Sequence, residues 1–354
     1  MHLSSPSVHS HTFPGDEFHG DVPLVAVRRG NYIGSVHRGV AVVADPAGQM
    51  IQAFGDVTQP VFLRSAAKPF QVMPAVVSGG IDQFGITEQE VAVLCASHSA
   101  EPRHMEAVLS VLQKIGLDED LLQCGVHAPI DQETAIARWQ AGIAPSPVCN
   151  NCSGAHAGML VACRALDFPI DGYGQPDHPL QRMTRDLLSA FTDVPADEIE
   201  YGVDNCAVPA FRFPLLQSAM AFARLITQEC VEQLLQDASA RVVHAMTTYP
   251  AMVGGAHSFD SDLMAAAHGE IVSKSGAEGF QGVGLRTVGA GVAIKVSDGN
   301  SRAVPPASLA ILNGLGVLDA SMQERLAEYN RPEQMSARGE PVGDLLSVLV
   351  AEQV

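Results

Sequence analysis

The 354-residue chain has few basic side chains and no long apolar run, and each shortage excludes a class of protein. Its 21 lysines and arginines face 39 aspartates and glutamates, which gives a net charge of −18. A protein that follows a nucleic-acid backbone needs an excess of basic side chains. A membrane-spanning helix needs roughly 18 or more consecutive apolar residues. We therefore expect neither nucleic acid nor a membrane as a partner.

A secretory signal is also missing from the start of the sequence. The segment "MHLSSPSVHSHTFPGDEFHGD" lacks a basic stretch followed by an apolar one. We interpret residues 1–21 as a flexible tail and expect a cytoplasmic protein. Without a signal, the odd number of seven cysteines predicts free thiols instead of a disulfide framework. No repeat or clear linker divides residues 22–354, which we expect to form one catalytic domain.

Strand-like runs with turn residues between them lie near both ends of the chain, at 24–55 and 282–300. Apolar residues at helical spacing dominate the region between them. Helices are expected at 62–80, 87–99, 101–116, 178–194, 305–316 and 322–328, with a helix-rich middle from 175 to 245. This order predicts an α+β fold, in which an antiparallel sheet joins both chain ends and helices pack around it.

The segment Ser65-Ala-Ala-Lys68 is the first candidate for catalysis. At the start of a helix, residues three apart lie on one face, and the helix dipole stabilises negative charge that develops on a hydroxyl. A neighbouring amine takes the hydroxyl proton if burial or a nearby cation lowers its pKa. A four-residue match is weak evidence by itself, because chance or helix capping also explains it.

Two later segments strengthen this interpretation. Lys274-Ser275-Gly276 lies in the strand-rich last third of the chain, and Ser97 follows an apolar helical run between the two. Serine β-lactamases and penicillin-binding proteins place a Ser-x-x-Lys, a second serine and a late Lys-Ser/Thr-Gly in this order. The three segments together predict a serine amidohydrolase on a β-lactamase-like fold.

The stretch "CNNCSGAHAG" (149–158) combines two cysteines with a histidine. If a helix begins there, Cys152 and His156 lie on the same face, and Cys206 would complete a set of three zinc ligands. Packing of the thiols as small apolar groups, with a local hydrogen bond for His156, explains the stretch equally well. A thioredoxin-like redox pair is disfavoured, because a proline-rich loop precedes Cys149 where a strand would be needed.

Five segments, taken together, resemble the asparaginase II family, the zinc-containing L-asparaginases of Rhizobium type. They occur in the family's order, and the resemblance runs from about residue 22 to the end: "RSAAKPFQ" (64–71), "CASHSAEPRH" (95–104), "CNNCSGAHAGML" (149–160), "VDNCAVPAF" (203–211) and "SKSGAEGF" (273–280). The resemblance implies a fold similar to serine β-lactamases and glutaminases, a homodimer, and hydrolysis of L-asparagine to L-aspartate and ammonia.

The resemblance also implies two Ser–Lys tandems in the active site. One consists of Ser65 with Lys68, and the other of Ser97 with Lys274. We expect Ser65 to be the nucleophile and Lys68 its base, because this serine stands at a helix start. The second tandem is expected to relay protons and to polarise the site.

Substrate and metal contacts follow in the same way. Arg64 and Asp204 match charges suited to the carboxylate and ammonium of an amino acid, and Cys152 and Cys206 match the family's cysteine ligands. The family's third zinc ligand is a lysine, and this chain has Ala155 at that position. We therefore expect zinc to be held weakly, unless water or His156 fills the vacant place.

The pattern departs from the family at two more positions, Gly34 and Ser258, where a glutamate and an arginine are expected. The principal prediction is an L-asparaginase that uses Ser–Lys chemistry. A related amidase or glutaminase of the same fold is one alternative. A catalytically weakened homologue that binds an amino acid is the other, because Ala155 replaces the ligand lysine.

Overall fold

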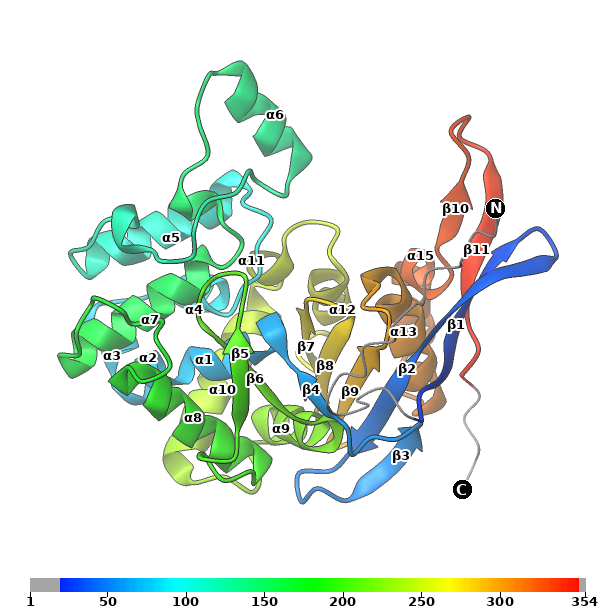
Figure 1. Ribbon diagram of the computed structural model, residues 1–354, viewed down its shortest axis with the longest axis horizontal. Helices are drawn as coiled ribbons and strands as arrows, with labels where there is room; N and C mark the ends of the chain where they lie inside the picture. Colours follow the sequence, from blue (N-terminus) through cyan, green and yellow to red (C-terminus); the bar gives the residue numbers. More distant parts are fainter. Residues whose placement is uncertain (1–19, 350–354) are drawn as a thin grey trace, which may run out of the picture.

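The computed structural model of the chain describes residues 20–349, so the tail expected at 1–21 lies almost wholly outside this range. The described part combines two antiparallel sheets with many helices (Figure 1). Its strands are β1 (Val22–Arg29), β2 (Tyr32–Ala44), β3 (Met50–Phe54), β4 (Pro60–Phe62), β5 (Glu200–Val203), β6 (Pro209–Pro214), β7 (Ile271–Gly276), β8 (Phe280–Leu285), β9 (Ala290–Val296), β10 (Glu333–Met335) and β11 (Pro341–Ser347).

The main sheet brings the two ends of the described chain side by side. Its strands follow the order β10-β11-β1-β2-β9-β8-β7, and β3 pairs with β2 beside this path. All of these pairs are antiparallel; β1 lies between β2 and β11, with Val27 opposite Leu345. The predicted α+β fold, with an antiparallel sheet that joins both chain ends, is confirmed. The hairpin expected near the start is present, with its turn at residues 45–49.

Side-chain alternation along β2 explains why helices cover both faces of this sheet. Val40 and Val42 belong to one apolar core, whereas Ala41 and Val43 belong to another on the opposite face. Helix α9 (Leu215–Thr227) packs on β2, β8 and β9 from the first side, and α13 (Val304–Gly314) packs from the second. The central strands β8 and β9 are buried along their whole length for this reason.

The remaining helices surround the first core and flank the second. They are α1 (Lys68–Gln71), α2 (Met73–Val77), α3 (Gly80–Gln83), α4 (Glu88–Leu94), α5 (Pro102–Lys114), α6 (Gln132–Gln140), α7 (Ser153–Leu166), α8 (Pro179–Thr192), α10 (Gln233–Thr248), α11 (Ala251–Gly254), α12 (Phe259–Ala267), α14 (Ala320–Arg325) and α15 (Ala327–Asn330), with short 3-10 turns η1 (Arg64–Ala67), η2 (Glu119–Leu121), η3 (Pro147–Cys149) and η4 (Ser301–Ala303). Within residues 20–349, no helix combines the length and apolar character needed to cross a membrane.

The helix expected over 62–80 is broken into η1, α1 and α2. Each of the two α-helices has a proline in its first turn, Pro69 in α1 and Pro74 in α2, where a ring without an N–H is tolerated but does not continue a preceding helix. Strands β4, β5 and β6 form a small second sheet that sequence periodicity did not reveal. Because β4 leads directly into η1, this small sheet fixes the entry to the Ser65–Lys68 segment.

Candidate active site

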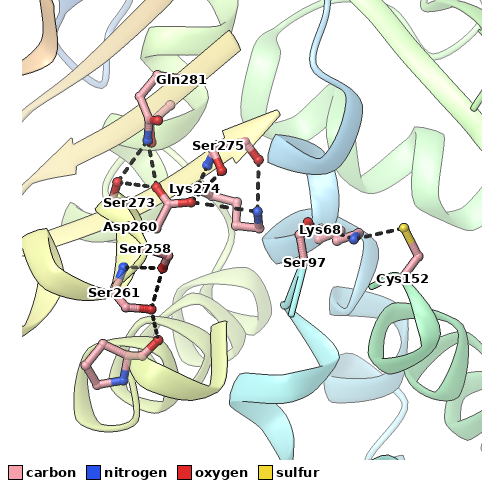
Figure 2. A network of polar contacts seen from close by, with 12 residues as sticks. Lys68, Ser97, Cys152, Ser258, Asp260, Ser261, Ser273, Lys274, Ser275 and Gln281 are labelled. Atoms are coloured by element: carbon pink, nitrogen blue, oxygen red, sulfur yellow. Dashed lines mark hydrogen bonds and ion pairs between the residues drawn. The ribbon is translucent and has the colours of Figure 1, made fainter. Parts of the chain in front are cut away.

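Four segments that are distant in sequence meet where the main sheet packs against the helices around the first core. They are η1 with α1, the loop after α4, the start of α7, and β7 (Figure 2). Two glycines allow the close approach. A Cβ atom at Gly276 would lie 2.2 Å from the carbonyl oxygen of Leu63, and one at Gly154 would lie 2.0 Å from that of Val93. Only glycine therefore lets β7 pass against η1 and α7 pass against α4 so closely.

Lys68 lies at the centre of the site and is buried. Its Nζ donates to Ser97 Oγ at 2.9 Å and to Cys152 Sγ at 3.2 Å. The backbone N–H of Ser97 is held in turn by the carbonyl of Val253 at 3.0 Å. The sequence had assigned Lys68 to Ser65; in the structure the hydrogen bond of its amine goes to the second serine.

Ser65 stands one turn before Lys68, whose backbone N–H donates to the Ser65 carbonyl. Its side chain is half-buried. In the part of the chain that the structure describes, the Ser65 hydroxyl has no hydrogen-bond partner. A hydroxyl without a fixed partner, on the same face as the lysine three residues later, is free to meet a substrate.

Lys274 reaches the site from β7, in the strand-rich last third of the chain. It is 1% exposed, and its Nζ donates to the carbonyl of Ser275 at 2.8 Å. The carboxylate of Asp260, near the start of α12, lies 3.9 Å from the same Nζ. In the view of Figure 2, Ser97 lies between Lys274 and Lys68.

The pKa of Lys274 is lowered to about 8. Burial is the main cause, because it disfavours the charged amine, and the positive charge of Lys68 acts in the same direction. The negative charge of Asp260 partly offsets both effects. An amine with a pKa near neutrality can take up and release protons at physiological pH, as proton transfer in catalysis requires.

The thiols of Cys152 and Cys206 lie next to each other. Their thiols share a hydrogen bond, which is the main reason why the pKa of Cys152 falls to about 5; the nearby Lys68 ammonium lowers it further. The same bond, together with burial, raises the pKa of Cys206. These shifts favour the thiolate form at Cys152, the thiol that lies 3.2 Å from Lys68 Nζ.

Neither ring nitrogen of His156 forms a hydrogen bond with the thiols of Cys152 and Cys206. Its Nδ1 lies 2.7 Å from the hydroxyl of Tyr173, which accepts from the backbone N–H of Gln123 at 2.8 Å. The tyrosine proton is thus directed to Nδ1, and the histidine proton sits on Nε2. Nε2 lies beside the Cys206 backbone and makes no hydrogen bond of ordinary geometry. Burial lowers the pKa of His156 to about 3, so the ring is neutral.

These observations bear on the expected zinc ion. The two thiols lie together, but Ala155 offers no donor and His156 presents a protonated nitrogen. Among residues 20–349, no group of three or more His, Cys, Asp or Glu side chains is arranged to hold a metal ion. The residues present therefore do not form the three-donor set of a zinc site. Zinc binding stays a prediction.

Charged residues expected to face the substrate lie beside Ser65. Arg64 Nη2 is 3.0 Å from Asp204 Oδ1, and Arg64 Nη1 is 3.0 Å from Glu278 Oε1. Asp204 is first among the causes that raise the pKa of Arg64. Arg64 and Asp204 are largely buried, with side chains 11% and 14% exposed, whereas Glu278 is 66% exposed. Glu278 was missed by the sequence reasoning, because a single glutamate in a glycine-containing turn gives no signal.

Three residues of the same segments have a strained backbone. Arg64, Ala100 and Ala207 have φ values of 52°, 61° and 67°, in the left-handed region that residues with a Cβ rarely adopt. Each belongs to one of the five segments that carry the resemblance. Such strain persists only where the surrounding structure enforces it, and it is typical of functional sites.

The structure also shows polar residues of the site that are not among the sequence-predicted ones. An aspartate at the position of Asp260 is expected to cap a helix, yet the cap of α12 is Ser258, whose hydroxyl accepts from the N–H of Ser261. Asp260 instead points into the site and bonds to residues around Lys274. Gln281 on β8 joins the same network. An aspartate in the first turn of a helix is indistinguishable in sequence from one that stabilises the helix dipole.

Comparisons with known proteins agree with the resemblance seen in the sequence. The sequence model of the family described as L-asparaginase II matches residues 25–346. A comparison with curated proteins finds no match.

Several solved structures are partly similar. Mglu in its native form is 17% identical over 80% of this chain and 66% of that chain, with a TM-score of 0.37. The Bacillus subtilis glutaminase YbgJ, in a covalent complex with 5-oxo-L-norleucine, is 13% identical over 82% of this chain and 92% of that chain, with a TM-score of 0.38. A Bacillus glutaminase is 14% identical over 79% and 91%, with a TM-score of 0.39.

These structural similarities are too low to carry an argument about this chain, which spans 66% of the Mglu chain. The family match is different, because it covers most of the described residues. On that match, the chain belongs to the L-asparaginase II family of amidohydrolases.

Proposed function

We propose that this protein hydrolyses the side-chain amide of L-asparagine to L-aspartate and ammonia, through an acyl-enzyme formed on Ser65. The observation that carries the proposal is the meeting of two buried lysines around Ser97, beside a serine with a free hydroxyl. Burying two amines is costly, and few roles other than proton transfer explain both of them in one place.

In the proposed reaction, Lys68 acts as a base in its neutral form, after its excess proton has passed through Ser97 towards Lys274. Ser65 Oγ then attacks the carbonyl carbon of the amide and passes its proton to Lys68. Collapse of the tetrahedral intermediate breaks the C–N bond, and the leaving nitrogen takes a proton from the lysine and departs as ammonia. Water then attacks the ester carbon and gives one proton to Lys68. As the bond between this carbon and Ser65 Oγ breaks, Lys68 passes that proton to Ser65 and aspartate is released. The hydrogen bond from Lys68 to Ser97 provides a path by which protons reach the side of Lys274.

Substrate selection is assigned to the charged residues beside Ser65. The guanidinium of Arg64 suits the α-carboxylate of an amino acid, and the carboxylate of Asp204 suits its α-ammonium. In the structure these two groups pair with each other at 3.0 Å. A zwitterionic substrate would exchange this ion pair for two new ones, so that no buried charge is left without a partner.

The proposal is tested by measuring ammonia released from L-asparagine by the wild type and by Ser65→Ala. Loss of the nucleophile should abolish release, by about 10³-fold or more. Ser78→Ala is the matched control, because this hydroxyl bonds only to the end of its own helix region and should leave turnover unchanged. Normal turnover in Ser65→Ala would overturn the assignment of the nucleophile. Parallel rates with L-glutamine and simple amides distinguish an asparaginase from a broader amidase.

One observation supports a second candidate, a homologue that binds an amino acid without hydrolysing it. Ala155 stands where the family's ligand lysine is expected, and the structure offers no third donor there. Calorimetry that detects asparagine binding, while ammonia stays at the blank level, would favour this candidate. The two serines and two lysines of the expected tandems are all retained, and this favours the enzyme. The homodimer and the cytoplasmic location stay predictions.

A further inference from the structure

Asp260 is a buried carboxylate, 4% exposed, and each of its oxygens accepts two hydrogen bonds. Its Oδ1 accepts from Ser273 Oγ at 2.7 Å and from Gln281 Nε2 at 2.9 Å. Its Oδ2 accepts from Ser275 Oγ at 2.6 Å and from the Ser275 N–H at 2.8 Å. Figure 2 shows these contacts converging on the one side chain. Burial raises the pKa of Asp260, but the charge of Lys274 and the hydrogen bonds from Ser275 and Gln281 outweigh this effect and lower it.

Two of the residues that donate to Asp260 lie on β7, next to Lys274. Ser273 and Ser275 are the residues immediately before and after Lys274. By binding both of them, the carboxylate holds the strand on either side of the lysine. Gln281 connects the neighbouring strand β8 to the same network, because its amide also donates to Ser273 Oγ at 2.9 Å. Asp260 therefore ties α12 to the segment of the sheet that carries Lys274.

Asp260 is also the nearest opposite charge to the Lys274 amine, at 3.9 Å. The other titratable groups that act on this amine are Lys68 on α1, Cys152 before α7 and Cys95 after α4. Lys68 carries a like charge, and Asp260 is first among the groups that favour the protonated form of Lys274. The carboxylate thus acts on the lysine both through geometry and through charge.

We propose that Asp260 is a positioning residue for Lys274, whose carboxylate fixes residues 273–275 of β7 and supplies the negative charge that faces the Lys274 ammonium. This inference rests on the proposed function only for the chemical role of the amine. The placement and the charge coupling are properties of the folded protein with or without substrate.

A purely structural anchor would hold β7 without changing how Lys274 titrates. The chain suits a direct measurement, since it has only four lysines, Lys68, Lys114, Lys274 and Lys295. Full-length protein labelled with ¹³C-lysine gives a small set of Cε signals, which are assigned by single Lys→Arg substitutions. The signals are followed against pH in buffer that contains a chelator, for the wild type and for Asp260→Asn.

In the wild type, the Lys274 signal should titrate near pH 8. Asp260→Asn removes the facing anion and should move this midpoint downward by about 1 pH unit or more. Asp262→Asn is the matched control, because this carboxylate lies on the same helix but binds the hydroxyl of Tyr329 at 2.6 Å. It should leave the midpoint unchanged. A Lys274 midpoint that is the same in Asp260→Asn and in the wild type would overturn the proposal.

Activity supplies a second readout. If neutral Lys274 is needed in turnover, the acidic limb of the pH–kcat profile should move downward with its midpoint in Asp260→Asn and return in Asp260→Glu, which restores the charge. A wild type that releases no ammonia contradicts the proposed function, yet leaves the titration experiment valid. If Asp260→Asn does not fold, Asp260→Ser, which is smaller and leaves room for a water, carries the same expectation.

Discussion

The two buried lysines of the site have contrasting surroundings. Lys68 faces sulfur: its amine bonds to Cys152, whose thiolate shares a proton with Cys206. Lys274 faces oxygen: its amine bonds to the Ser275 carbonyl and lies near Asp260. Both amines are almost wholly removed from water.

The contrast separates two ways of keeping a charged amine buried. On the Lys274 side, a helix and two strands supply a network in which each carboxylate oxygen has two donors. On the Lys68 side, the anion comes from a thiol pair that would otherwise be available to a metal ion. We therefore expect the residues around Lys274 to be held rigidly. The charge environment of Lys68 should instead change when a metal ion binds or when the thiols are modified.

The largest expected effect is on turnover. Lys68→Met and Lys274→Met should each reduce ammonia release by about 10² to 10⁴-fold, because each removes a group that transfers protons. Lys114→Met is the control, since this lysine binds Glu90 and the Gly85 carbonyl on a remote part of the helical region. Steady-state assays at one pH check all three variants. Full activity in either site variant would show that the lysine it lacks takes no part in proton transfer.

A smaller effect concerns folding. Asp260→Asn should lower the free energy of unfolding by about 3–5 kcal/mol, because Lys274 loses the ionic partner that compensates its burial. Asp262→Asn should cost only about 1 kcal/mol, since it weakens a single hydrogen bond to Tyr329. Denaturant unfolding of both variants measures the difference. Equal costs would show that the buried network is not what stabilises this half.

Stability should also depend on pH through Lys274. Its pKa is lowered in the folded protein from 10.5 to about 8, so the unfolded chain binds more protons between these values. The contribution of Lys274 to stability therefore improves as pH rises through this window and is least favourable below pH 8. Lys274→Met lacks this dependence, so its stability relative to the wild type should be about 1 kcal/mol more favourable at pH 7 than at pH 9. A difference from the wild type that is the same at both pH values would contradict the lowered pKa.

The smallest expected effect is on the Lys68 side, where a third metal donor is missing. Ala155→Lys places an amine at the family's ligand position and should increase zinc bound per chain, measured by elemental mass spectrometry after dialysis. Ala157→Lys, two residues further along the same helix, is a control for added charge. Unchanged zinc content in Ala155→Lys would show that position 155 is not a ligand position in this chain.

Much of the fold could be read from the sequence, because period and turn chemistry are local signals. The runs that became β2 and β9 alternate or persist as apolar stretches, and the Asp-Pro-Ala-Gly turn marks the hairpin that β2 forms with β3. The break between α9 and α10 was less visible. Gln228 and Cys230 adopt φ values of 60° and 58° there, and neither glutamine nor cysteine predicts a left-handed backbone conformation.

The site was only partly predictable for a related reason. Short spacings identified Ser65 with Lys68 and found Lys274, and the structure brings both lysines to one place. Which serine each lysine meets depends on how α1, the loop after α4 and β7 pack, and no local pattern encodes that. Asp260 escaped notice because its partners lie 13 to 21 residues away on two strands.

The most direct test of the account is a double-mutant cycle on the two lysines. Ammonia release from L-asparagine is measured for the wild type, Lys68→Met, Lys274→Met and the double variant. If both amines serve one catalytic centre, the double variant should be no slower than the slower single variant, since residues that act as a unit are not additive. Losses that multiply in the double variant, as for two independent sites, would contradict the account.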